Sequence, residues 1–308
     1  MSLSLEIFAP RARAGEAQLA TNILRDAEAL GVVIYVSISG NDDAVLRLAA
    51  STREHKLRPQ IQLQCGPGQP SELDDSLKRA LAAGISSVLL LGDDPGSTLE
   101  TVKHVKARHG AAVSIAVCGF PRGTTGRYEE CLAGVRAAIA AGADRVVAMP
   151  VLEAAVALQY VTDLGQVGGT CTVQPSLLPV HAFGGVAELQ RVARSLGIHV
   201  PDALRTQLCA LPSGPFRAAG HEHFLTQLRR LMAGTTSPVH VAVLNSAAVM
   251  DSLRVADLGG APKGRSLDAA PDRIQDAERG AHLMRHVAVV AVIVIAAAAG
   301  TRIWMAKR

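Results

Sequence analysis

The chain has 308 residues, of which 49% are hydrophobic and only 3% aromatic. This length and apolar content suffice for one large α/β domain with a sizeable core. The formal net charge of +4 comes from residues 262–308, which carry eight Lys or Arg against four Asp or Glu. The preceding part of the chain is therefore close to neutral, which gives no electrostatic argument for a nucleic-acid partner.

The cysteine pattern indicates a reducing environment. The five cysteines form no Cys-x-x-Cys pair and their number is odd, so the simplest interpretation is reduced, mostly buried thiols in a protein that faces the cytosol. The amino terminus, Met-Ser-Leu-Ser-Leu-Glu, has neither the basic region nor the long apolar core of a secretory signal.

Apolar runs alternate with helical patterns along the first 256 residues, and we expect eight strand-then-helix units. Strands are predicted at 3–8, 32–37, 60–64, 87–91, 112–118, 145–149, 171–177 and 239–244. Helices are predicted at 14–29, 42–55, 71–83, 98–108, 128–140, 153–163, 185–196, 201–208, 221–233 and 246–256. Gly84, Gly142 and Gly197 should end their helices in the left-handed conformation.

Strands that alternate with helices of this length imply parallel pairing, and eight units predict a closed (β/α)8 TIM barrel over residues 1–256. An open, doubly wound sheet is the alternative. No Gly-x-Gly-x-x-Gly follows the first predicted strand, which argues against a dinucleotide-binding Rossmann domain.

The fourth predicted strand ends at a pair of acids. Its sequence, Ser-Val-Leu-Leu-Leu, has no polar alternation and suits a strand that is buried on both faces. Asp94 follows it, and Ser97 with Glu100 matches a capping box that would open the next helix. Because side chains at strand carboxyl ends face the mouth of a barrel, Asp94 is a candidate site residue. The alternative is an ordinary turn residue.

Two further segments follow the predicted barrel. Residues 257–284 are rich in Gly, Pro and mixed charges, which is typical of a flexible linker. Residues 287–301 carry no charge, and a helix extended past Trp304 would span about 28 Å. Basic residues flank this stretch. We expect 285–308 to be a single C-terminal transmembrane tail that leaves the barrel in the cytosol, with the mitochondrial outer membrane as the suggested target. The alternative is a buried core helix.

Six stretches, in the order in which the family has them, resemble methylenetetrahydrofolate reductase, the flavin enzyme of one-carbon metabolism. For example, Leu-Glu-Ile-Phe-Ala-Pro is similar to the family's Phe-Glu-Phe-Phe-Pro-Pro opening, and Val-His-Val-Ala-Val-Leu-Asn to its Val-His-Phe-Tyr-Thr-Leu-Asn. The stretches are 5–11, 90–95, 117–121, 141–144, 175–180 and 239–245. Together they are spread over the whole predicted barrel, residues 1–256.

The resemblance implies a barrel that holds FAD at the strand carboxyl ends. NAD(P)H would reduce the flavin, and hydride would then pass to 5,10-methylenetetrahydrofolate, giving 5-methyltetrahydrofolate. Glu6 falls at the position of the general acid, and a partly desolvated carboxyl can have its pKa raised enough for that role. Ser37 and Phe120 fall at flavin positions, Asp94 lies where it would contact flavin and folate, and Phe183 matches the aromatic that stacks on the substrate.

The chain also departs from the family pattern, at basic positions expected near the flavin's ring and phosphates and at a Gln, here Met149, that the family would use in folate recognition. Gly92, Thr124 and Ala138 replace an Arg, a His and a basic residue, and Gln62 and Met149 replace a His and a Gln. Each lost charge-assisted hydrogen bond would cost about 1.5–3 kcal/mol, so FAD binding could be much weaker. Nearby arginines at 122, 127 and 136 are candidate substitutes.

These departures favour a second interpretation, a membrane-anchored pseudoenzyme that keeps the barrel as a binding or regulatory module. The choice between NADH and NADPH stays open, as does assembly into a homo-oligomer. No metal site is expected. His221 and His223 are two residues apart and would point away from each other on a helix, so we interpret them as part of a solvated helix start.

Removal of the predicted tail should release the protein from membranes. A fusion that lacks residues 281–308 is expected in the soluble fraction after centrifugation, because the apolar stretch is the only predicted anchor. Continued sedimentation of that fusion with membranes would refute the anchor.

Overall fold

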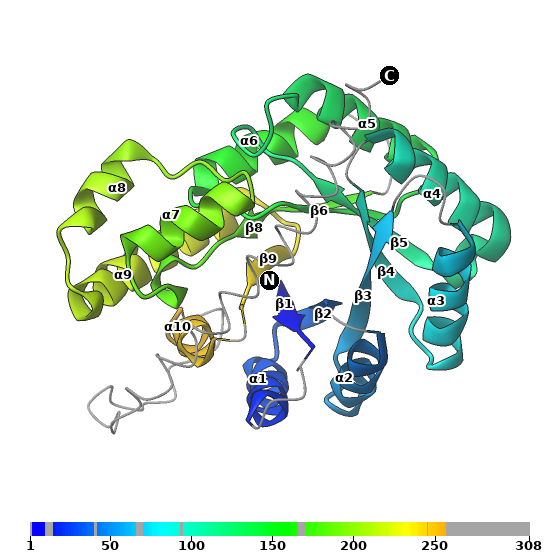
Figure 1. The fold of residues 1–308 in the computed structure, drawn as a ribbon, viewed down its shortest axis with the longest axis horizontal. Helices are drawn as coiled ribbons and strands as arrows, with labels where there is room; N and C mark the ends of the chain where they lie inside the picture. Colours follow the sequence, from blue (N-terminus) through cyan, green and yellow to red (C-terminus); the bar gives the residue numbers. More distant parts are fainter. Residues whose placement is uncertain are drawn as a thin grey trace, which may run out of the picture.

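The computed structural model describes residues 2–9, 15–39, 42–65, 70–92, 95–165, 171–244 and 246–256. Within these ranges the chain forms a ring of parallel strands with helices around the outside (Figure 1). The strand order is β7-β6-β5-β4-β3-β2-β1-β9-β8. This arrangement confirms the predicted TIM-type barrel and rules out the open, doubly wound sheet. The segments β7 and β8 stand at opposite ends of the order although a single residue separates them in the chain, and this is possible only if the sheet curls round into a ring.

The elements follow the predicted alternation. The strands are β1 (Leu3–Phe8), β2 (Val33–Ser39), β3 (Arg58–Cys65), β4 (Ser87–Gly92), β5 (Ser114–Gly119), β6 (Arg145–Ala148), β7 (Thr172–Gln174), β8 (Ser176–Leu177) and β9 (Val239–Ala242). The helices are α1 (Glu16–Leu30), α2 (Asp42–Glu54), α3 (Pro70–Ala82), α4 (Pro95–His109), α5 (Tyr128–Ala140), α6 (Ala154–Leu164), α7 (Val186–Ser195), α8 (Asp202–Cys209), α9 (Ser213–Gly234) and α10 (Ala247–Val255), with short 3₁₀ turns η1 (Gly110–Ala112) and η2 (Val180–Ala182).

The ring closes through one predicted strand that is broken at Pro175. The first half, β7, pairs with β6, whereas the second half, β8, pairs with β9. Proline has no N–H to donate to a ladder, but its carbonyl accepts a hydrogen bond of 2.8 Å from the backbone N–H of His240. The nine strand segments are therefore the eight strands that the sequence predicts, with the seventh divided between its two neighbours.

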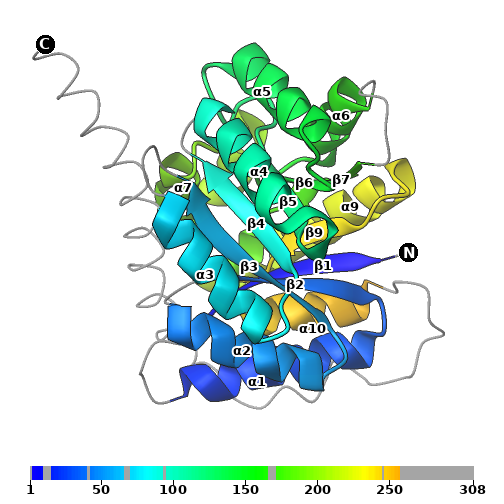
Figure 2. The ribbon, with the colours of Figure 1, turned by 90° about the vertical axis from the view of Figure 1, so that its right-hand side faces the viewer.

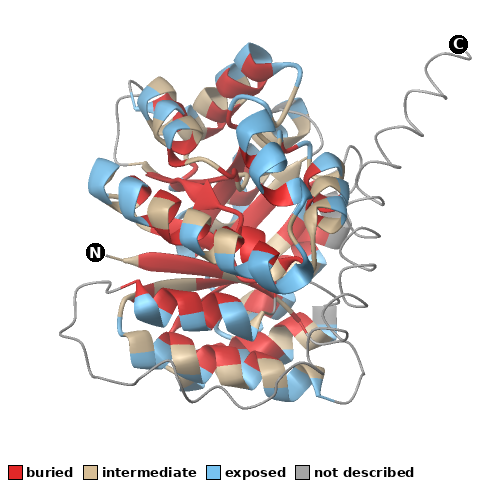
Figure 3. Cartoon of the chain, turned by 90° about the vertical axis from the view of Figure 1, so that its left-hand side faces the viewer, coloured by how far each residue is buried: buried red, intermediate tan, exposed pale blue. Residues whose placement is uncertain are grey.

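Alternation along each strand separates two kinds of side chain. In β1, Leu3, Leu5 and Ile7 are buried in the large apolar cluster that the strands share with the surrounding helices. Ser4 and Glu6 lie on the other face, toward the inside of the ring. Figure 2 shows α3 and α4 along the outside of β3 and β4, and Figure 3 shows buried strands beneath helices whose outer surfaces are exposed.

Three local predictions can be compared with the structure. Gly84, Gly142 and Gly197 have φ angles of +74°, +108° and +68°, which confirms the left-handed helix ends. The helix expected to open at the Ser97 capping box already begins at Pro95, because proline's fixed φ suits the first helical position. The helix predicted at 221–233 is longer, since α9 runs from Ser213 to Gly234.

No helix in the described ranges is long and apolar enough to cross a membrane. The predicted linker at 257–284 and the predicted transmembrane tail at 285–308 both lie outside the described residues.

Gly220 should be intolerant of any side chain, because α9 packs tightly on η2 at this point. A Cβ there would lie 2.9 Å from Val180 Cγ1 and 3.0 Å from the backbone nitrogen of His181. Gly220→Ala is expected to cost about 1–3 kcal/mol in the free energy of unfolding, measured by urea denaturation of the full chain. Gly214 is on the same helix with nothing within 4 Å of a Cβ, so Gly214→Ala should leave stability within about 1 kcal/mol. Equal effects of the two substitutions would contradict this packing.

Candidate active site

Glu6 is the centre of a polar cluster inside the barrel. Its side chain is 21% exposed, on a strand whose alternate residues, Leu5 and Ile7, are completely buried on the opposite face. The Gln62 side-chain amide on β3 donates a hydrogen bond of 2.8 Å to Glu6 Oε1. On the other side, His240 Nε2 lies 3.6 Å from Glu6 Oε2. Three strands thus converge on one carboxyl group.

His240 is held between two residues of β1. It lies opposite Ser4 in the β1–β9 register, and its Nδ1 is 3.1 Å from Ser4 Oγ. The imidazole is only 2% exposed. Ser4, His240 and Glu6 therefore form a continuous polar row, with the partly exposed carboxylate at one end. Sequence reasoning placed His240 only within a family-like stretch and assigned it no role.

Cys118 on β5 faces the same carboxylate. Burial raises the pKa of its thiol to about 12, and the negative charge of Glu6 adds to that shift. Cys118 therefore stays a neutral thiol at physiological pH and is not a nucleophile. Glu6, Gln62 and Cys118 come from alternate strands, as expected for one interior layer of such a barrel.

The ionisation of Glu6 differs from the expectation. Burial alone would raise the pKa of this carboxyl, but the hydrogen bond and positive charge of His240, together with the Gln62 amide, outweigh burial and lower it. The predicted rise in pKa is therefore wrong. Glu6 is ionised at neutral pH, and its partners stabilise the carboxylate form.

The other predicted site residues have different surroundings. Ser37 pairs with Glu6 in the β1–β2 register, but it is completely buried, and its hydroxyl accepts a hydrogen bond of 3.0 Å from Gln60 Nε2. Phe120 is half-buried after β5, and its backbone N–H donates to Tyr160 Oη at 3.1 Å. Asp94 lies outside the described residues.

Phe183 is packed inside an apolar cluster and has no exposed surface. This cluster joins α7, α8 and α9 to Leu178, which follows β8, and to Leu244, which follows β9. It therefore covers the carboxyl ends of these two strands. Stacking of Phe183 on a substrate remains a prediction, and it would require this cluster to open.

A chain of hydrogen bonds that the sequence did not reveal lies deeper in the barrel. Arg145 Nη2 donates to Ser87 Oγ at 2.6 Å, and Ser87 in turn bonds Gln60 at 3.3 Å. The Arg145 guanidinium lies 4.1 Å from the centre of the Tyr35 ring. The signal was present in the sequence as the alternation of Gln with apolar residues at 60–64, which marks one polar and one apolar strand face.

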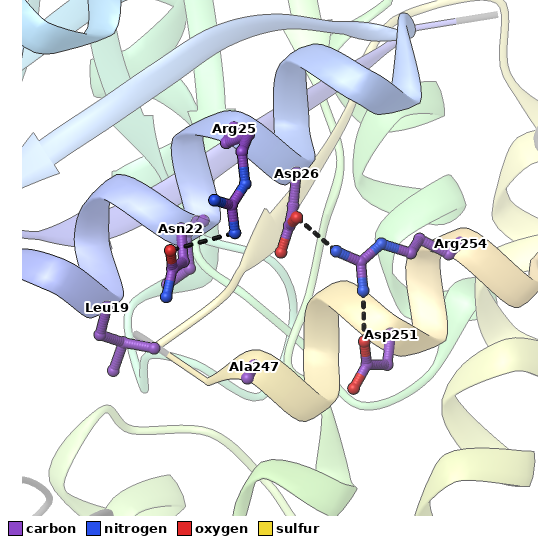
Figure 4. A pocket seen from close by; sticks show the side chains of 8 residues that line it. Leu19, Asn22, Arg25, Asp26, Ala247, Asp251 and Arg254 are labelled. Atoms are coloured by element: carbon purple, nitrogen blue, oxygen red, sulfur yellow. Dashed lines mark hydrogen bonds and ion pairs between the residues drawn. The ribbon is translucent and has the colours of Figure 1, made fainter. Parts of the chain in front are cut away.

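Two other features are not part of this site. A pocket of about 410 Å³ lies on the outside, between α1 and α10, where Arg254 pairs with Asp26 and Asp251 (Figure 4). Because these charges already pair with one another, the pocket offers no free charged group of that set to a ligand.

The His221 and His223 side chains each have a hydrogen-bond partner within the chain. In the part of the chain that the structure describes, no group of three His, Cys, Asp or Glu could hold a metal ion. His221 Nδ1 lies 2.8 Å from Ser252 Oγ, and His223 Nε2 lies 2.9 Å from the Leu152 carbonyl. Both side chains are partly buried in the middle of α9, so the interpretation as a solvated helix start is wrong.

Comparison with known proteins identifies the family. A family profile described as methylenetetrahydrofolate reductase matches residues 1–254. The chain belongs to the methylenetetrahydrofolate reductase family. It is 23% identical over 237 residues to methylenetetrahydrofolate reductase (NADH) 1 of Arabidopsis thaliana, covering 67% of this chain and 40% of that protein. It is 24% identical over 269 residues to a probable methylenetetrahydrofolate reductase (NADPH) of Caenorhabditis elegans, covering 79% and 40%.

Other matches are shorter or weaker. A probable methylenetetrahydrofolate reductase (NADH) of Oryza sativa is 25% identical over 175 residues, covering 48% of this chain and 30% of that protein. The chain thus spans less than half the length of these curated relatives. Among solved structures, 2,3-dimethylmalate lyase aligns over 95% of this chain and 92% of its own, with 12% identity and a TM-score of 0.47.

Several described residues on the strands of the barrel have buried polar atoms without hydrogen-bond partners. Ser39 Oγ, at the carboxyl end of β2, is shielded from solvent and has no hydrogen-bond partner among the described residues. The same holds for the side-chain amide of Gln174 and the hydroxyl of Ser176 within the barrel. Since buried polar groups are rarely left unbonded, these atoms fit a polar ligand in the barrel.

The described residues fit the diphosphate half of FAD less well. Arg122 and Arg127 each pair with a glutamate of α5, at 3.2 and 3.0 Å, and Arg136 donates to the Asp163 carbonyl at 2.6 Å. All three candidate substitutes for the missing basic residues are thus bonded within the chain. The two glutamate pairs are exposed, however, and such pairs contribute only about 0–1 kcal/mol, so a phosphate could displace them.

Glu6→Gln should change how the free energy of unfolding depends on pH in the acid range. The pKa of Glu6 is lower in the folded state than in the unfolded chain, where it is near 4.5. Glu6 therefore contributes to the free energy of unfolding above that pH, and this contribution is lost as the pH falls through the folded-state pKa. The variant loses charged hydrogen bonds worth about 1.5–3 kcal/mol at neutral pH. The midpoint temperature of thermal unfolding should therefore be lower for the variant than for wild type at neutral pH. This difference should become smaller below about pH 4.5. Glu130→Gln, at an exposed position, is the matched control. A difference in midpoint temperature that becomes larger in acid would contradict the lowered pKa.

Proposed function

We propose that this chain is a flavin-dependent reductase of the methylenetetrahydrofolate reductase type. It would pass hydride from NAD(P)H through FAD to 5,10-methylenetetrahydrofolate. The observation that carries the proposal is that Glu6, which the family resemblance assigns as the general acid, is a partly exposed carboxyl group inside a barrel whose family match extends over residues 1–254. The fit of the polar barrel atoms to a flavin ring adds support.

The chain's own residues would manage orientation and the proton. FAD, when bound, would supply the hydride chemistry. Gln62 fixes the Glu6 carboxylate through its hydrogen bond at Oε1. The apolar cluster around Phe183 would keep water away from one side of the site. Reduction of the methylene bridge consumes a proton as well as a hydride, and we propose that Glu6 takes up this proton at its exposed edge and delivers it. Asp94, Ser37 and Phe120 remain proposed contacts.

A catalytically degenerate, membrane-anchored binding module is the second candidate. Gly92, Thr124 and Ala138 stand where the family has groups expected near the flavin, and the Thr124 hydroxyl donates to the Pro121 carbonyl at 2.7 Å. The complete burial of Phe183 also supports the binding module, because a buried ring cannot stack on a substrate. In both cases we propose that residues 285–308 anchor the barrel on the cytosolic side of a membrane.

A visible spectrum would separate the two functions. The full chain, purified in mild detergent and incubated with FAD, should show bound flavin absorbance that NAD(P)H removes and methylenetetrahydrofolate restores. Glu6→Gln should keep the first half-reaction and slow the second by about 10²-fold or more. Glu54→Gln, at an exposed position at the end of α2, should keep both. A chain that stays colourless with FAD would refute the reductase and favour the binding module.

A further inference from the structure

Phe120 differs from the other phenylalanines because its ring has no place in the apolar core. Three of the five, Phe183, Phe216 and Phe224, are at most 1% exposed, and Phe8 packs against the cluster that holds Phe183. Phe120 is half-buried and belongs to none of the apolar clusters that the described residues form. Its ring is therefore free to contact a flat ligand at the carboxyl end of β5.

The peptide group that leads into Phe120 is held at both ends. Its carbonyl, on Gly119, accepts a hydrogen bond of 2.7 Å from the backbone N–H of Met149, which follows β6. Its N–H, on Phe120, donates to Tyr160 Oη on α6 at 3.1 Å. Because both polar atoms are bonded, the plane of this peptide group cannot rotate without losing a hydrogen bond. Pro121 restricts the backbone of Phe120 further, since a residue before proline has fewer allowed conformations.

Tyr160 is anchored firmly enough to hold this peptide group. Its side chain is 1% exposed within the large apolar cluster, and its ring packs edge-on against Tyr128 with ring centres 6.5 Å apart. Burial raises the pKa of Tyr160, so its hydroxyl stays neutral and its oxygen remains an acceptor. The approach requires glycine at position 119, because a Cβ there would overlap the Tyr160 hydroxyl and lie 2.8 Å from the ring carbon Cε1.

We propose that Tyr160 is a positioning residue, which fixes the peptide group before Phe120 and thereby directs the Phe120 ring toward the flavin. This inference rests on the proposed function. Tyr160 is buried beneath the end of β5 and acts only through Phe120, to which it is joined by one hydrogen bond across 40 positions of sequence. The planar flavin ring would be the group that Phe120 contacts.

A fixed Phe120 would matter more in this chain than in its relatives. A contact that is ordered before the ligand arrives loses less conformational freedom on binding. Gly92, Thr124 and Ala138 stand where the family resemblance places charged groups near the flavin. With those groups absent, a pre-ordered apolar contact would supply a larger share of the affinity for the flavin ring.

Amide hydrogen exchange in the full chain, without flavin or folate, tests the hold of Tyr160 on the peptide group. Tyr160→Phe keeps the ring in the core but removes the acceptor, so the Phe120 amide should exchange at least about tenfold faster than in wild type. Tyr128→Phe is the matched control, because it also removes a tyrosine hydroxyl, one whose hydrogen bond goes to Asp163. In the control, the Phe120 amide should exchange as in wild type. Unchanged exchange in Tyr160→Phe would overturn the proposal. Tyr160→Met serves as a second variant if the first fails to fold by circular dichroism.

The affinity for FAD tests whether Tyr160 acts through Phe120. Tyr160→Phe should raise the Kd of FAD about tenfold, and Phe120→Ala should raise it by at least as much. In the Phe120→Ala background, Tyr160→Phe should have no further effect beyond about twofold, because the ring that it positions is gone. Equal losses in both backgrounds would show general support of the fold and would overturn the positioning role. Faster exchange in a chain that never binds FAD would refute the reductase, and with it the flavin contact, while the hold of Tyr160 on the peptide group would stand.

Discussion

A closed ring of parallel strands must divide its side chains between two environments, and the rest of this structure depends on that division. Leu3, Leu5 and Ile7 of β1 pack outward beneath the helices, which turns Ser4 and Glu6 inward. A shift of one residue in register would exchange the two sets and expose the apolar one to a polar interior. The apolar outer layer thus fixes where Glu6 points, far more firmly than any polar contact could.

The inner face of the described strands carries many polar side chains. Barrels of this type are commonly filled by Val, Ile and Leu, but here the apolar interior cluster contains mainly Leu89, Ala116 and Val147. Much of the remaining space is filled by hydrogen-bonded side chains, such as the row from Arg145 through Ser87 to Gln60. A buried polar group is costly unless bonded, so the bonded members of this row fix one another's positions.

The family assignment supports the reductase chemistry, whereas some details of the site do not favour binding of a cofactor or substrate. The match over residues 1–254 and the setting of Glu6 favour the family's chemistry. The paired arginines and the buried Phe183 indicate that this region would have to rearrange before a cofactor or substrate could bind. Both observations are reconciled if binding energy opens exposed ion pairs and the apolar cluster, because weak surface pairs are easily exchanged for phosphate contacts.

The sequence by itself determined the strand-helix alternation, the barrel, the glycine helix ends and the family, because these depend on local patterns and on motifs read in order. Only the tertiary structure decided the chemistry of Glu6. Ser4 and His240 are 236 positions apart, and no local pattern reports that they meet beside one carboxylate. The length of α9, the break at Pro175 and the burial of Phe183 likewise arise from packing between distant segments, where tertiary contacts override local signals.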